Sequence, residues 1–78
     1  MKYYLAINEY GVRSLFTNED LDAFAENHNG NRNPFELFSG TGNNEEDIVT
    51  DIYVCELTNQ GLIYTKKLDR ETLQEIDL

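Results

Sequence analysis

Acidic side chains dominate the residues of this chain that could do chemistry. The 78 residues include 15 Asp and Glu but only six Lys and Arg, which gives a formal net charge of −9. Residues 9–56 contain eleven of the acids and two of the bases, so this stretch alone carries −9 and the remainder sums to zero. Such a chain repels nucleic acid and anionic membranes, and it is attracted to basic partners at a rate that falls with salt. The basic cluster Lys66, Lys67 and Arg70 is too small to change this, and we expect it to pair with acids near the end of the chain.

His28 and Cys55 are poor candidates for catalysis. Each is the only residue of its type, so neither has the second His or Cys that a metal site requires. We expect His28 to lie in the last turn of a helix, where an imidazole packs against the core or interacts with the carboxyl end of the helix. We expect Cys55 to be a small apolar residue of a central strand, since no base is near it in sequence. The sequence therefore predicts a protein that is not an enzyme and has no cofactor.

The other binding motifs are also weak. Residues 29–47 are rich in Asn and Gly and contain oxygen ligands, but they do not match the spacing of a calcium loop. A divalent-ion site at Glu45, Glu46 and Asp47 stays open as an alternative to simple solvated charges. The sequence contains neither the phosphate-binding G-x-x-x-x-G-K-[ST] motif nor the hydrolase G-x-S-x-G motif.

The elements that must position the acids follow from hydrophobic periodicity. Alternation over residues 2–8 and again over 12–16, with a turn between them, predicts a β-hairpin. Thr17 predicts the start of a helix that runs to about residue 28, because Thr17 and Asp20 have capping-box spacing. We expect its buried stripe to consist of Leu21, Phe24, Ala25 and His28. The opposite, solvent-facing side carries Glu19, Asp22 and Glu26.

The second half of the chain repeats this order. Residues 33–38 predict one helical turn, with Asn33 as its cap and Gly40 as its terminator. Residues 48–57 form the longest β-branched run and predict the central strand, with alternating faces. Residues 62–68 predict its hairpin partner. Leu68, Asp69 and Leu73 repeat the spacing of Phe16, Thr17 and Leu21, which predicts a short closing helix containing Leu73 and Ile76.

The predicted fold is therefore α+β, in the order ββα-loop-ββα. We expect a single domain over residues 1–78, with a four-stranded antiparallel sheet and helices packed on one face. The chain has no apolar run of the roughly 18 residues that cross a membrane, and residues 1–11 lack the apolar run of a signal peptide. Together with the unpaired Cys55, this predicts a cytoplasmic protein.

The clustered acids suggest a binding surface. Duplex DNA carries one negative charge per roughly 1.7 Å of axis, so carboxylates held on a rigid face can occupy a basic groove that normally binds phosphate. The predicted partner-binding residues are Glu19, Asp22, Glu26, Glu45, Glu46, Asp47, Asp51 and Phe35. Among them, Phe35 would add non-electrostatic contact.

In size, acidity and α+β layout the chain resembles the small phage-encoded inhibitors, namely anti-CRISPR proteins, anti-restriction DNA mimics and host-takeover proteins. The acidic helix NEDLDAFAEN and the loop NNEED carry this resemblance. It implies a non-enzymatic protein of the host cytoplasm that binds a basic, nucleic-acid-handling complex and blocks nucleic-acid access to it.

Two alternatives stay open. One is a small homodimer joined through an exposed edge strand, in which the charge only maintains solubility and self-association is insensitive to salt. The other is an ion-binding domain or small enzyme that uses the carboxylates, whose melting temperature would rise with divalent ions.

Overall fold

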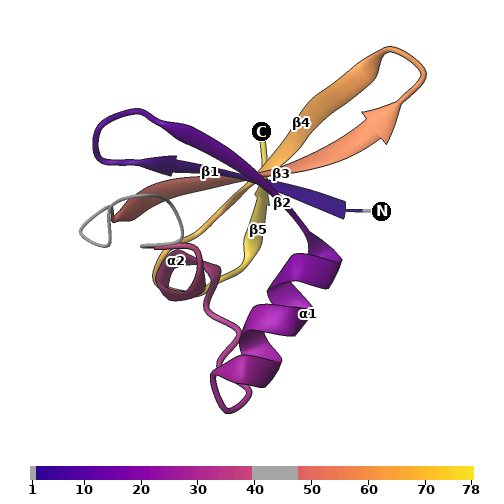
Figure 1. The fold of residues 1–78 in the computed structure, drawn as a ribbon. Coiled ribbons are helices and arrows are strands. Elements are labelled where there is room, and N and C mark those ends of the chain that lie inside the picture. Colours follow the sequence, from indigo (N-terminus) through magenta and orange to yellow (C-terminus); the bar gives the residue numbers. More distant parts are fainter. Residues whose placement is uncertain (1, 40–47) are drawn as a thin grey trace.

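A computed structural model describes residues 2–39 and 48–78, which form an antiparallel five-stranded sheet and two short helices (Figure 1). The strands are β1 (Lys2–Asn8), β2 (Arg13–Thr17), β3 (Val49–Thr58), β4 (Gly61–Leu68) and β5 (Glu75–Asp77), and the helices are α1 (Asn18–Asn27) and α2 (Pro34–Leu37). The strand order is β2-β1-β3-β4-β5, so β3 is the central strand, as the sequence predicts. The α+β class is confirmed, but the sheet has five strands where four were expected.

The capping box that starts α1 forms as predicted. The Asp20 backbone N–H donates to the Thr17 hydroxyl oxygen at 3.1 Å, and the Thr17 backbone N–H donates to the Asp20 carboxylate at 2.8 Å. Leu21 and Ala25 are buried, whereas His28 is exposed. The expectation that His28 completes the buried stripe is wrong, because the helix ends at Asn27 and the imidazole Nδ1 lies 2.8 Å from the Phe24 carbonyl oxygen.

The single turn α2 also begins where the sequence predicts. The Asn33 side chain accepts a hydrogen bond from the Phe35 backbone N–H at 3.0 Å, and Pro34 takes the first helical position. The predicted terminator Gly40 lies outside the described residues.

Both helices pack on the same face of the sheet (Figure 1). The core between them and the sheet consists of Tyr4, Ala6, Leu21, Ala25, Phe35, Leu37, Phe38, Val49, Ile52, Val54 and Leu68. Phe16 and Phe38 stack with their ring centroids 4.0 Å apart, and Phe24 meets both rings edge-on. Phe38 is buried and Phe16 and Phe24 are partly buried, so this aromatic cluster, together with the buried Leu21 and Ala25, packs α1 against the sheet.

Two bulges break the regular alternation expected for β3 and its neighbours. Ile7 pairs with Asp51 but Asn8 pairs with Val49, so Thr50 is extra, and its hydroxyl donates to the Ile7 carbonyl oxygen at 3.2 Å. The bulge turns Val49, instead of Thr50, into the core beside Ile52. Regular alternation over residues 48–57 would place Ile48, Thr50, Ile52, Val54 and Glu56 on one face, and this is therefore correct only in part.

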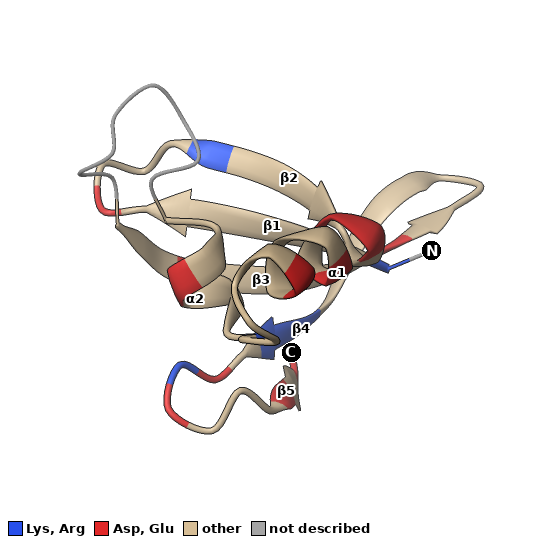
Figure 2. Cartoon of the chain, turned by 60° about the horizontal axis from the view of Figure 1, so that its bottom comes forward, with Lys and Arg blue, Asp and Glu red and all other residues tan. Residues whose placement is uncertain are grey.

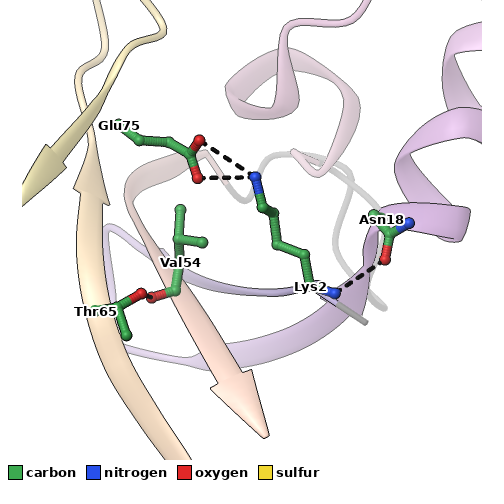
Figure 3. A network of polar contacts seen from close by, with 5 residues as sticks. All are labelled: Lys2, Asn18, Val54, Thr65 and Glu75. Carbon is green, nitrogen blue, oxygen red and sulfur yellow. Dashed lines mark hydrogen bonds and ion pairs between the residues drawn. The ribbon is translucent and has the colours of Figure 1, made fainter.

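The second bulge lies in β4. Val54 pairs with Lys66 but Cys55 pairs with Tyr64, which leaves Thr65 unpaired in the ladder. The Thr65 hydroxyl donates to the Val54 carbonyl oxygen at 3.3 Å (Figure 3). In both bulges a threonine hydroxyl therefore supplies a hydrogen bond where the ladder is interrupted.

The closing helix predicted around Leu73 and Ile76 is wrong. Asp69 does act as a cap, and its carboxylate accepts from the Thr72 backbone N–H at 2.8 Å. Leu73, however, takes φ of 61°, which a helix cannot continue, and residues 75–77 pair with β4 as the fifth strand. Pairing with the free edge of β4 satisfies the backbone N–H and C=O groups of these residues. A helix of only one or two turns is marginally stable and would satisfy fewer of them.

One ion pair joins the two ends of the chain. The Lys2 ammonium lies 3.0 and 3.2 Å from the two carboxylate oxygens of Glu75, and the Lys2 backbone N–H donates to the Asn18 side-chain oxygen at 3.2 Å (Figure 3). The first strand, the start of α1 and β5 are thus linked. Among the described residues, no helix is both long and apolar enough to cross a membrane.

Candidate functional site

Three of the predicted binding residues lie together on the outer surface of α1. Glu19, Asp22 and Glu26, which we call the acidic helix face, are all exposed. Figure 2 shows how the acidic segments are spread along α1. Because the helix rises about 1.5 Å per residue, Glu19 and Glu26 are separated by about 10 Å along its axis. The capping box and the aromatic cluster hold these carboxylates on a rigid support.

The acids of α1 differ in the partners they already have. Asp20 is engaged in the capping box. Asp22 forms an ion pair with Arg32 at 2.7 Å, and both side chains are more than half exposed. Within residues 2–39 and 48–78, neither Glu19 nor Glu26 forms an ion pair. Glu19 and Glu26 are therefore the acids of α1 most ready to meet an external cation.

Sequence reasoning missed one neighbouring acid, Glu36. It lies in the first turn of α2, is exposed, and accepts a hydrogen bond from the Asn31 side chain at 2.8 Å. Because α2 contacts α1, Glu36 extends the acidic surface of the helix layer (Figure 2). The signal was present in the sequence, since Glu36 stands between the apolar Phe35 and Leu37 in the first turn of the predicted helix, where an acid is favoured by the helix dipole.

Asp51 does not belong to this surface. It pairs across the strands with Ile7 and lies on the side of the sheet away from the helices, where its carboxylate is 3.2 Å from the Lys67 ammonium. The hydrogen bond to Asp51 raises the pKa of Lys67, whose ammonium also lies 5.7 Å from the Tyr53 ring centroid. Asp51 was predicted to belong to the same partner-binding set as the acids of α1, but the sheet separates it from them.

Phe35 is a core residue and not a surface contact. Only 5% of it is exposed, and the Arg70 guanidinium lies over its ring at 5.8 Å from the centroid. Little of the Phe35 side chain is therefore open to the partner that the sequence prediction assigned to it. The three remaining predicted residues, Glu45, Glu46 and Asp47, lie outside the described part of the chain.

The two residues considered for catalysis lie in different environments. Cys55 is fully buried, and burial raises the pKa of its thiol, which keeps it protonated. His28 lies on the surface at the end of α1. Within residues 2–39 and 48–78, no three His, Cys, Asp or Glu side chains are grouped so that they could hold a metal ion.

Comparisons with protein-family models, with curated protein sequences and with solved structures found no match to this chain. Its function is therefore argued from its own residues.

Proposed function

We propose that this protein is a non-enzymatic inhibitor of the anti-CRISPR-like kind. Its acidic helix face binds the nucleic-acid-binding surface of a basic host defence or nucleic-acid-processing complex and blocks nucleic-acid access. The observation that carries the proposal is the placement of Glu19, Asp22 and Glu26 along the exposed side of one capped and well-packed helix. Glu36 enlarges the same surface.

The rigidity of α1 matters because a mimic of phosphate must present its charges without reorganisation. The carboxylates stand on a helix whose first turn is fixed by Thr17 and whose inner side is fixed by Leu21 and Ala25. Little backbone entropy is then lost on binding, which leaves more of the electrostatic attraction as affinity.

The Asp22–Arg32 pair does not oppose this role. Both side chains are more than half exposed, so the pair contributes no more than about 1 kcal/mol and a cation of the target can replace Arg32. Binding carried by such exposed charges is fast at low ionic strength and weakens as salt rises.

A tagged pull-down from bacterial lysate tests the proposal. The tagged protein is immobilised and incubated with nuclease-treated lysate, once at low and once at high salt. The lysate proteins that it retains are identified by mass spectrometry. We expect a basic nucleic-acid-binding complex to be retained at low salt, released at high salt and displaced by added DNA or guide RNA. The proposal would be contradicted if added nucleic acid did not displace the retained complex, or if only the tagged protein itself were recovered.

A further inference from the structure

The side of the sheet away from the helices carries an apolar surface, which we call the helix-free face. Side chains of directly paired residues point to the same side of a sheet, so the strand register defines this face. Its members are Tyr3, Leu5, Ile7, Arg13, Leu15, Thr17, Asp51, Tyr53, Cys55, Leu57, Leu62, Tyr64, Lys67 and Ile76. Among the described residues, both helices pack on the opposite face, and neither covers this one (Figure 1).

Large apolar side chains of this face are open to solvent. The exposed fractions are 48% for Leu15, 63% for Leu57, 40% for Leu62, 48% for Tyr64 and 53% for Ile76. With the partly buried Tyr3, Ile7 and Tyr53, they offer on the order of 600 Å² of apolar surface, the upper end of what a soluble monomer shows. A standard interface buries about 800 Å² per partner, so this face and its polar rim are large enough for one stable contact.

The charges of the helix-free face favour a second copy of this chain as its binding partner. It carries only Arg13, Lys67 and Asp51, a formal charge of +1, whereas the whole chain carries −9. Two copies that met through their helix layers would bring like charges together, but two copies that meet through this face would not. A strongly basic partner, in contrast, would be drawn to the acidic helix face.

The shape of the face also suits a second copy. The β3–β4 hairpin projects beyond the rest of the sheet (Figure 1), and Leu57 and Leu62 lie opposite each other near its tip. At the other end of the same two strands lies a hollow of about 400 Å³, where the apolar side chains of Ile76 and Leu78 stand beside charged ones, namely Asp51, Lys67, Asp69, Arg70 and Asp77. In a two-fold arrangement the projecting leucines of each copy would reach this end of the other, where Ile76 and Leu78 offer them apolar contact.

We propose that the helix-free face joins two copies of this chain in solution, with the sheets packed face to face. The centre of this contact is the Tyr53–Tyr64 pair, whose rings stack with centroids 5.8 Å apart over the middle of the sheet. Aromatic side chains are enriched in protein interfaces, and the Lys67–Asp51 ion pair beside Tyr53 keeps the two charges at this centre paired with each other. The contact uses the side of the molecule opposite the acidic helix face, so it does not depend on the proposed inhibitory function.

Sedimentation equilibrium from low micromolar to near-millimolar concentration tests this dimer. The test variant is Leu62→Glu, and the matched control is Ile63→Glu. Ile63 is the next residue of β4, is 44% exposed and pairs with Glu56 on the helix side. We expect the wild type and Ile63→Glu to dimerise, and Leu62→Glu to bind itself at least about tenfold more weakly. Leu15→Glu, on another strand, should have the same effect, and circular dichroism checks that every variant is folded.

If the wild type stays monomeric at every concentration, the proposed homodimer is wrong, and the helix-free face would bind a different protein. Equal weakening by Leu62→Glu and Ile63→Glu would overturn it as well. Because the contact is mainly apolar, raising the salt should not dissociate it. Leu62→Glu should also retain any basic target found in lysate, which separates a failure of the dimer from a failure of the proposed function.

Discussion

Asp69 shows how a single carboxylate shapes the end of this chain. It accepts hydrogen bonds from the Thr72 hydroxyl at 2.7 Å and from the Thr72 backbone N–H at 2.8 Å, and these bonds lower the pKa of Asp69 below its ordinary value. Since the folded pKa lies below the unfolded one, the stabilisation is complete above about pH 4 and is lost as the pH falls through the folded value.

Asp69→Asn should therefore lower the melting temperature at neutral pH, and the difference from wild type should shrink as the solution is acidified. Thermal unfolding followed by circular dichroism over a pH series measures this. Glu71→Gln, at an exposed position of the same turn, is the charge-matched control and should not reproduce the pattern. A difference that stays constant with pH would show that the Asp69 carboxylate is not the titrating group.

Cys55 provides a second test at the residue scale. Its side chain is fully buried on the central strand, and burial raises the pKa of its thiol. A thiol-specific reagent should therefore react with the folded protein at least about a hundredfold more slowly than with the protein in urea, because only opened molecules expose the thiolate. Equal rates in the two states would contradict the burial of β3.

At the scale of elements, the start of α1 depends on one side chain. Removal of the Thr17 hydroxyl leaves the Asp20 backbone N–H without its partner. Thr17→Ala should lower the free energy of unfolding by about 0.5–2 kcal/mol, whereas Thr17→Ser keeps the cap and should stay close to wild type. Urea denaturation measures both variants, and equal losses in the two would mean that the hydroxyl is not what caps the helix.

The bulge at Thr50 determines which of its neighbours should matter more for stability, Ile48 or Val49. Regular alternation would bury Ile48, but the structure buries Val49 to 5% exposure and leaves Ile48 49% exposed. Val49→Ala should therefore destabilise the fold by about 1–3 kcal/mol, and Ile48→Ala by no more than about 0.5 kcal/mol. Urea denaturation measures both variants. If Ile48→Ala destabilised the fold more than Val49→Ala, β3 would have regular alternation without the bulge.

These elements also show what the sequence can and cannot predict. The capping box of α1, the turn α2 and the central strand follow from residues close together in the chain, and all three were predicted. The Thr50 and Thr65 bulges depend on carbonyl oxygens of neighbouring strands, Ile7 and Val54, which local periodicity does not contain. β5 forms for the same reason, since the open edge of β4 competes with the helix that Asp69 would otherwise start.

At the scale of the whole molecule, the sheet divides the surface into two sides of different character. Glu19, Asp22 and Glu26 were correctly expected to share one exposed helix side, because helical spacing alone determines it. The places of Asp51 and Phe35 could not be predicted in this way. The sheet puts Asp51 on the far side with Lys67, and the packing of α2 on β3 buries Phe35.

The most direct test of the inhibitory role compares two variants of equal charge. Glu19→Lys with Glu26→Lys alters the acidic helix face, whereas Glu9→Lys with Glu71→Lys alters two exposed turns, and each pair moves the net charge from −9 to −5. In the low-salt pull-down from nuclease-treated lysate, the first pair should bind the retained complex at least about tenfold more weakly and the second should bind it nearly as the wild type does. Equal retention by both pairs would contradict the central claim that α1 is the binding surface.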